Sequence, residues 1–149
     1  VPEGEKYDFS KNLFPRLLEM GWPMYAQAIN GVWFDVGSPQ ELIRAQNVLT
    51  ERREELPFPM PKGTISENGS FINISADVHQ TAIVTGSVIS KGAIVGQNAV
   101  LNHCVLMNGA RVGDGVELQN CILSPNSKVD SNVVANDVIL GDYDVLKNE

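Results

Sequence analysis

Three stretches of the sequence align without gaps: Gly86-Ser-Val-Ile-Ser-Lys-Gly-Ala-Ile-Val-Gly96, His103-Cys-Val-Leu-Met-Asn-Gly-Ala-Arg-Val-Gly113 and Asn120-Cys-Ile-Leu-Ser-Pro-Asn-Ser-Lys-Val-Asp130. Each stretch begins 17 residues after the one before it. Within them, triplets of a small, a variable and an aliphatic residue recur, and the aliphatic positions step by 6, 6 and 5 residues. A chain that cycles through three short steps winds around a three-sided prism, one coil per cycle.

Successive coils of such a prism stack as parallel strands about 4.7–4.9 Å apart. The small and aliphatic residues of each triplet then point inward and the middle residue points outward. About four coils fit in the repeat, which exceeds the usual minimum of three. The cycle comes one residue early near 133–140, so we expect a frayed last coil or a cap there, with the acidic tail Gly141–Glu149 closing the open end.

The triplets resemble the hexapeptide repeats of the left-handed parallel β-helix. The resemblance covers residues 72 to about 140 and implies the left-handed winding, which the spacing itself does not determine. The sequence therefore predicts a mainly β protein, with a β-helix domain over 62–149 preceded by a small α/β segment.

The first 56 residues follow a different pattern. Residues 8–21 predict a short helix, with Pro15 in its first turn and Gly21 as its stop. Asn30-Gly31 separates two apolar runs, 24–29 and 32–36, which predicts a β-hairpin. Ser38-Pro-Gln-Glu41 predicts the start of a helix that continues to about Glu55. Residues 57–61, Pro-Phe-Pro-Met-Pro, predict a stiff extended linker.

The large apolar side chains of this front segment are too numerous for one hairpin and two helices to bury. Another polypeptide segment or another subunit is expected to cover them, and packing back on the β-helix is the alternative. The side chains in question are Phe9, Leu13, Phe14, Leu17, Leu18, Trp22, Trp33, Phe34, Leu42 and Ile43.

Two motifs of the front segment resemble the C-terminal end of the catalytic domain of sugar-phosphate nucleotidyltransferases. They are Asp8-Phe-Ser-Lys-x-Leu-Phe-Pro-x-Leu-Leu and Gly31-Val-Trp-Phe-Asp-Val-Gly-Ser-Pro-Gln-Glu-Leu-x-x-Ala45. In that family a hexapeptide-repeat β-helix often follows, as it does here. The resemblance implies that 1–56 is a remnant of the catalytic domain. Translation initiation exchange factors share this arrangement, so it does not by itself imply catalysis.

Nucleotidyl transfer joins a sugar 1-phosphate to a nucleoside triphosphate and expels pyrophosphate, and it needs Mg²⁺ held by carboxylates. The resemblance implies that Asp35, in the Trp-x-Asp-x-Gly turn, is a metal ligand. Its place before a helix N-terminus, where anions are well received, agrees with this role. The alternative is that Asp35 and Ser38 only cap the following helix.

The sequence departs from the family in lacking a glycine-rich phosphate loop, a second recognisable metal carboxylate and a lysine in a sugar-phosphate motif. With nothing to position the triphosphate, we expect this chain alone to be inactive. It is expected to be the C-terminal piece of a complete enzyme or the companion of a separate N-terminal half. The first residue, Val1, also suggests a cut or processed chain.

A rival function is acyl transfer, because many hexapeptide-repeat proteins move acetyl groups from coenzyme A in clefts between subunits. That chemistry needs a histidine base. His103 lies at a corner of a coil and His79 lies on the outside of an earlier one. No long loop interrupts the coils to form a substrate pocket, which weighs against this function. A pure assembly module is the second rival.

Two features of the coils bear on redox state and on assembly. Cys104 and Cys121 fall one coil apart at one inward position, where buried free thiols are favoured over a disulfide. Val88, Val105 and Ile122 are outward residues on one face and form an apolar stripe, which is typical of a contact surface. Either the helix at 38–55 covers this stripe, or a homo-oligomer forms through the β-helix.

Composition narrows the remaining possibilities. The 149 residues carry a net charge of −7, which argues against a nucleic-acid surface or a polybasic membrane anchor. The sequence shows neither an apolar run long enough to span a bilayer nor an opening leader. With two cysteines and no zinc-ligand spacing, we expect a cytoplasmic protein.

Overall fold

The computed structural model describes residues 3–148. The chain divides into two compact units between Asn30 and Gly31. The first unit contains a π-helical turn, η1 (Phe9–Leu13), and a short helix, α1 (Phe14–Glu19). Asp8 caps η1 by accepting a hydrogen bond from the backbone N–H of Lys11 at 2.8 Å. Pro15 lies in the first turn of α1, and Gly21 follows it with a φ of +68°, so the predicted helix is confirmed.

The predicted hairpin at 24–29 and 32–36 is wrong. The structure assigns neither strand nor helix to residues 22–37. A two-stranded hairpin is marginal in water unless a third strand or a packed face supports it. Within the described residues the strand pairings all lie between Gly63 and Leu146, so the front segment finds no such support.

The second helix is confirmed as α2 (Pro39–Glu51), followed by a 3-10 turn, η2 (Arg53–Glu55). The Ser38 hydroxyl accepts the backbone N–H of Glu41 at 3.2 Å, and proline occupies the first helical position, as the sequence predicts. Arg52 and Glu55 form a salt bridge across the end of the helix. Residues 56–61 then run without regular secondary structure to the first strand.

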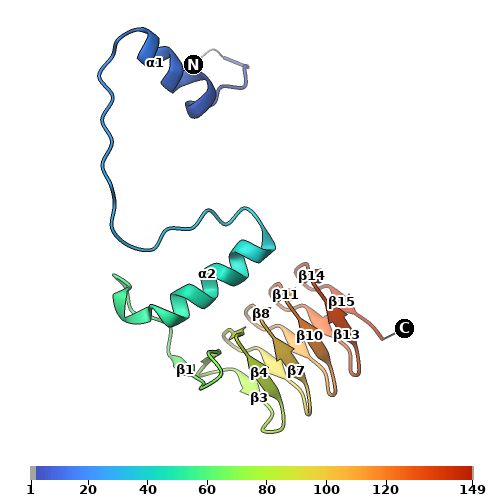
Figure 1. The fold of residues 1–149 in the computed structure, drawn as a ribbon. Coiled ribbons are helices and arrows are strands. Elements are labelled where there is room, and N and C mark those ends of the chain that lie inside the picture. The colour runs from blue at the N-terminus through green and yellow to red at the C-terminus, as the bar shows by residue number, and fades with distance from the viewer. Residues whose placement is uncertain (1–2, 149) are drawn as a thin grey trace. The chain divides into compact units, whose positions relative to one another are not determined.

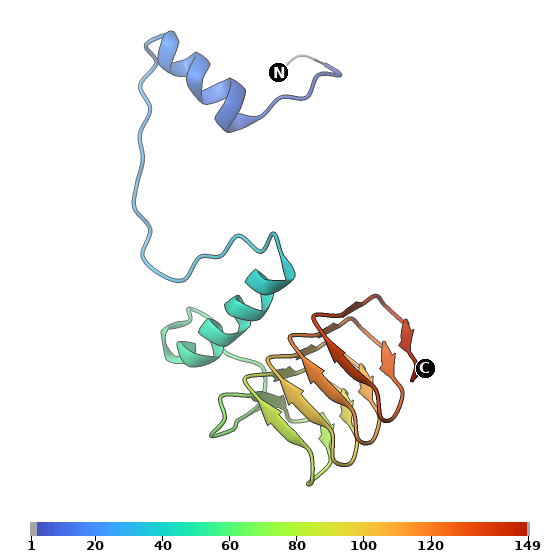
Figure 2. The same cartoon turned by 45° about the vertical axis from the view of Figure 1, so that its right-hand side comes forward.

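The rest of the second unit is a parallel β-helix with three faces, of the left-handed hexapeptide-repeat class that the sequence predicts (Figures 1 and 2). The first face contains β1 (Gly63–Ile65), β2 (Phe71–Asn73), β5 (Val88–Ile89), β8 (Val105–Leu106), β11 (Ile122–Leu123) and β14 (Ile139–Leu140). The second contains β3 (Asp77–Val78), β6 (Ile94–Val95), β9 (Arg111–Val112), β12 (Lys128–Val129) and β15 (Val145–Leu146). The third contains β4 (Ile83–Thr85), β7 (Val100–Asn102), β10 (Glu117–Gln119) and β13 (Val134–Asn136).

Every parallel pair keeps the 17-residue register. On the first face, for example, Val88 is opposite Val105, and Ile122 is opposite both Val105 and Ile139. The strand β1 is the exception, because it pairs antiparallel with β2 and covers the first coil. The inward aliphatic and small residues of all three faces form one continuous core, in which Ile89, Leu101 and Leu106 are fully buried.

The expected slip in the last coil does not occur. Val134 is opposite Glu117 and Val145 is opposite Lys128, so the register holds through β13 and β15. The apparent slip arises because Ala135 occupies an aliphatic position, which makes the flanking valines look like a shifted triplet. The tail from Gly141 continues the coil up to Leu146 instead of closing it, and Glu149 lies outside the described residues.

Candidate functional site

Asp35 lies in the irregular segment before α2, and its side chain is exposed to solvent. Its carbonyl oxygen accepts the backbone N–H of Gly37 at 2.9 Å. No group of three or more histidine, cysteine, aspartate or glutamate side chains gathers around a possible metal position within residues 3–148. Mg²⁺ can be held by one or two carboxylates together with substrate phosphates. The described residues bring no group of three such side chains to Asp35, so its role as a metal ligand stays a prediction.

The apolar stripe of the first face lies under α2. Val88, Val105 and Ile122 point out of the β-helix core, yet they are 9%, 3% and 4% exposed. Figures 1 and 2 both show α2 running alongside the coils. Of the two alternatives for this stripe, the structure therefore shows coverage by a helix of the same chain.

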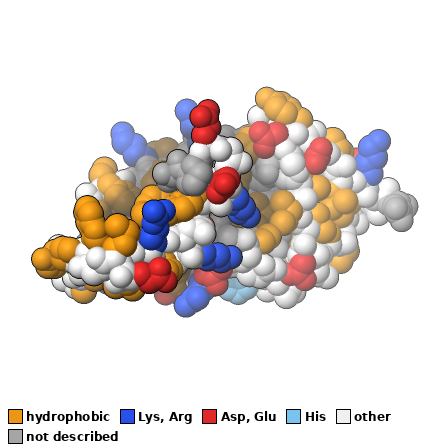
Figure 3. All heavy atoms as spheres, turned by 90° about the horizontal axis from the view of Figure 1, so that it is seen from above, with side chains coloured by type: hydrophobic (Ala, Val, Ile, Leu, Met, Phe, Trp, Pro, Cys, Tyr) orange, Lys and Arg blue, Asp and Glu red, His pale blue; other side chains and the backbone are white. Residues whose placement is uncertain are grey.

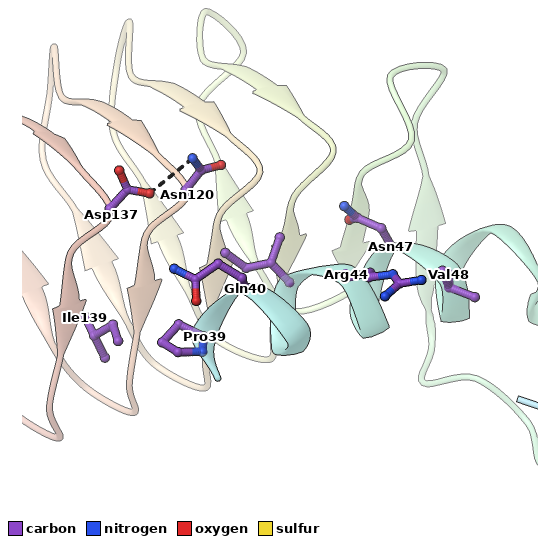
Figure 4. Close-up of a pocket in the computed structure, with 9 residues that line it drawn as sticks. Pro39, Gln40, Arg44, Asn47, Val48, Asn120, Asp137 and Ile139 are labelled. Atoms are coloured by element: carbon purple, nitrogen blue, oxygen red, sulfur yellow. Dashed lines mark hydrogen bonds between the residues drawn. The ribbon is translucent and has the colours of Figure 1, made fainter. Parts of the chain in front are cut away.

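The residue that follows the stripe on the next coil is not covered in this way. Ile139, on β14, remains 54% exposed beside the first turns of α2. A cavity of about 360 Å³ opens there between the helix and the last coils (Figure 4). Its lining combines aliphatic side chains with amides, one carboxylate and one guanidinium: Pro39, Gln40, Ile43, Arg44, Asn47, Val48, Asn120, Asp137 and Ile139.

Two polar residues of this cavity belong to a column at the corner between the third and first faces. Gly86, His103, Asn120 and Asp137 occupy equivalent positions of four coils, and all have a φ between +51° and +57°. The side-chain amide of Asn120 donates a hydrogen bond to Asp137 at 3.2 Å (Figure 4). Glycine, asparagine and aspartate tolerate this left-handed backbone conformation best. Of this column the sequence interpretation included His103 but missed Asn120 and Asp137, although the 17-residue period aligns all three.

The two histidines proposed as acyl-transfer bases do not lie together. His79 and Thr81 share a hydrogen bond at 2.9 Å between Nδ1 and the hydroxyl oxygen, on the first coil. The His103 ring occupies the space beside Gly86, where an added Cβ would come within 2.6 Å of Nδ1. His103 also borders a second cavity, of about 340 Å³, together with Asn47 and Glu51 of α2.

Cys104 and Cys121 are free thiols with no exposed surface, as predicted. They continue an inward column that begins with Ser70 and Ser87. Hydrogen bonding to Cys121 and burial raise the pKa of the Cys104 thiol well above its ordinary value. A thiol held protonated in this way is a poor nucleophile and a poor metal ligand, so Cys104 is structural. The same hydrogen bond with Cys104 lowers the pKa of the Cys121 thiol to about 7.

Large apolar side chains reach the surface in several places (Figure 3). In the front segment, Phe9 is 68% exposed, Trp22 60% and Trp33 72%. None of the described residues of η1 and α1 is buried. These residue types usually form a core, and the prediction that further polypeptide buries them stays a prediction.

The β-helix matches a known family over most of its length. The model of the GMPPB C-terminal domain matches residues 66–149. The chain belongs to this family. The match starts just after β1 and includes the four coils. The GMPPB C-terminal domain is thus joined here to α2 and the front segment.

Curated relatives of this GMPPB C-terminal domain chain are nucleotidyltransferases. It is 37% identical over 87 residues to glucose-1-phosphate adenylyltransferase of Clostridioides difficile, covering 55% of the chain and 22% of that protein. It is 32% identical over 60 residues to UTP--glucose-1-phosphate uridylyltransferase of Synechocystis, covering 40% and 16%. The chain thus spans about a fifth of the length of the relatives that it matches.

One of the solved structures that the chain matches is that of a variant of the perosamine N-acetyltransferase of Caulobacter crescentus. It shares 14% identity at a TM-score of 0.33, and the match covers 90% of this chain and 68% of that one. This likeness is too low to bear on function. Among the described residues, no helix is both long and apolar enough to cross a membrane.

Proposed function

We propose that this chain is the C-terminal part of an enzyme that makes a nucleotide sugar from a nucleoside triphosphate and a sugar 1-phosphate. The chain by itself is inactive in this proposal, and the β-helix serves assembly or regulation. The observation that carries it is the family match over residues 66–149. The nucleotidyltransferase relatives, at 37% and 32% identity, support the same reaction class.

The exposed apolar residues of the front segment support a missing partner domain. Trp33 stands two residues before Asp35 and is 72% exposed, so burying it would also order the segment that carries the carboxylate. In this proposal the N-terminal catalytic half covers these side chains and completes the magnesium site around Asp35. Asp35 would hold Mg²⁺ in that site, and the ion would supply the positive charge that nucleotidyl transfer needs at the phosphoryl group.

Assembly of the complete enzyme is proposed to use the β-helix. Since α2 already covers the first face, a homo-oligomer would use the second or third face. On the third face, Ile83 and Val134 are 56% and 68% exposed. Two buried free thiols fit a reducing compartment, which supports a cytoplasmic location.

Pyrophosphate release tests the proposal. The chain alone and a longer polypeptide that carries the upstream half are each incubated with Mg²⁺, a set of nucleoside triphosphates and hexose 1-phosphates. We expect release from the longer polypeptide only. The substitution Asp35→Asn should lower kcat by about 100-fold or more if the carboxylate holds the metal, whereas the exposed Asp77→Asn should leave it unchanged. Absence of release from the longer polypeptide would contradict the enzyme assignment.

The rival functions make different predictions. A hexapeptide-repeat acyltransferase must bind acetyl-coenzyme A. Calorimetric titration of the purified chain with acetyl-coenzyme A tests this, and absence of binding would exclude acyl transfer. His103 borders a cavity and is the residue that such chemistry would use. An assembly module like the exchange-factor subunits would give neither pyrophosphate release nor acetyl-coenzyme A binding, but would still self-associate.

A further inference from the structure

The cavity between α2 and the last coils has the features of a small-ligand site. Its volume of about 360 Å³ falls within the range of ligand pockets, which are mostly apolar with a few converging polar groups. It is half open rather than enclosed, because α2 passes over the stripe but leaves Ile139 54% exposed. Pro39, Ile43 and Ile139 supply the aliphatic surface.

Polar groups face this aliphatic surface from both sides. On the β-helix, the side-chain amide of Asn120 donates to Asp137 Oδ1 at 3.2 Å. The Asp137 Oδ2 atom and the side-chain oxygen of Asn120 can still accept hydrogen bonds from a ligand. On α2, the amides of Gln40 and Asn47 form no side-chain hydrogen bond with any described residue. Figure 4 shows Pro39 and Gln40 at the start of α2, beside the coils that carry Asn120, Asp137 and Ile139. Donors and acceptors of three amides and one carboxylate therefore surround the space.

Charge and ring chemistry narrow the class of ligand. Arg44 is the one cation among the lining residues, and its side chain is 69% exposed and lies 3.5 Å from Glu41. The carboxylate of Asp137 opposes any anion, so a phosphate has no well-held cation to bind. The lining contains no aromatic ring on which a flat heterocycle could stack.

A ligand that matches this lining is uncharged, has many hydroxyl groups and presents a C–H surface. We propose that the cavity binds a neutral hexose ring, with its hydroxyls on Asp137, Asn120 and Gln40 and its C–H face on Ile139 and Pro39. The site is separate from the proposed nucleotidyl transfer, because its residues belong to α2 and the β-helix and exclude Asp35. It would let this domain sense a sugar whether or not the catalytic half is attached.

Titration followed by NMR tests the site directly. The ¹⁵N-labelled full chain is titrated with glucose, mannose and, as a control, glycerol. We expect saturable shifts for the hexoses in the side-chain amides of Gln40, Asn47 and Asn120 and in the backbone near Ile139, with Kd values of about 1–10 mM. Glycerol should give no saturable shift at these positions.

Variants separate specific binding from general effects. Asp137→Asn keeps a residue that tolerates the left-handed backbone and removes the charged acceptor, and should weaken hexose binding about tenfold or more. Ile139→Trp should fill the cavity and abolish binding. Asp77→Asn, on the outer side of the first coil, should leave binding unchanged.

The proposal is overturned if the hexoses give no saturable shifts, if glycerol gives the same ones, or if Asp137→Asn binds like the unsubstituted chain. Binding of glucose 1-phosphate more than about tenfold tighter than glucose would also overturn it, because the site would then recognise the phosphate. Since no arm of the experiment measures catalysis, its failure leaves the proposed enzymatic function untouched, and the reverse also holds.

Discussion

The hydroxyl oxygen of Ser87 accepts a hydrogen bond from the backbone N–H of Cys104, one coil further along, at 2.9 Å. The same hydroxyl donates to the carbonyl oxygen of Thr85 at 2.8 Å. Ser70 makes the equivalent bond to the backbone N–H of Ser87 at 3.1 Å. The left-handed residues Gly86 and His103 turn the chain just before these N–H groups, and the inward side chain supplies the acceptor that joins the coils.

Substituting Ser87 by alanine therefore leaves the buried N–H of Cys104 without an acceptor. We expect the free energy of unfolding, measured in urea, to fall by about 1–3 kcal/mol. Ser90→Ala is the matched control, because the Ser90 hydroxyl makes no hydrogen bond with the described residues, and it should stay within about 0.5 kcal/mol. Equal losses for the two variants would show that the acceptor does not matter.

The thiol of Cys104 should make stability depend on alkaline pH. In the folded protein its pKa is raised, first by hydrogen bonding to Cys121 and then by burial. Above the unfolded value of about 8.5, the unfolded chain releases a proton that the folded chain keeps. The contribution of Cys104 to the free energy of unfolding is therefore fully present below this pH and is lost by about 1.4 kcal/mol per pH unit above it. Cys104→Ser should reduce the slope, and an unchanged slope would contradict this assignment.

Gly63 has no room for a side chain. A Cβ added there would lie 2.4 Å from the carbonyl oxygen of Ile72 and 2.7 Å from the ring of Phe71, in the antiparallel pair that covers the first coil. Gly63→Ala should cost about 1–3 kcal/mol of unfolding free energy. Gly37→Ala is its control, since nothing lies within 4 Å of the added atom, and it should be near neutral. Equal unfolding free energies for Gly63→Ala and Gly37→Ala would contradict the steric role of Gly63.

The β-helix was predictable because its signal repeats: the 17-residue cycle is sampled four times, and one misread position, Ala135, shifts only the interpretation of the last coil. The absence of a hairpin around Asn30-Gly31 was not predictable in the same way, because the local turn sequence does not show whether a third strand or a packed face is present to support it. From the sequence, the column Ser87, Cys104 and Cys121 indicates only that the inward position requires a small side chain. The role of the Ser87 hydroxyl as an acceptor could not be predicted, because it depends on a backbone N–H one coil away. Asn120 and Asp137 could have been found by aligning the corner positions, whereas the cavity beside them depends on where α2 ends its coverage of the stripe.

Coverage of the first face by α2 leads to a contrast between two outward valines. Val105 is 3% exposed beneath the helix, whereas Val134 is 68% exposed on the third face. Val105→Ala should lower the free energy of unfolding by about 1–2 kcal/mol, and Val134→Ala should change it by less than about 0.5 kcal/mol. Val105→Asp goes further, because a carboxylate under the helix has no partner there.

We expect Val105→Asp to release α2 while the coils stay folded, because the inward core does not include Val105. Limited proteolysis should then cut the α2 segment and the linker at 56–61 rapidly and leave a resistant fragment that begins near Gly63. Val134→Asp should show the slow cleavage of the unsubstituted chain. If Val105→Asp instead unfolds the whole β-helix in one step, α2 and the coils form a single cooperative unit, and the expectation that α2 detaches from folded coils is wrong.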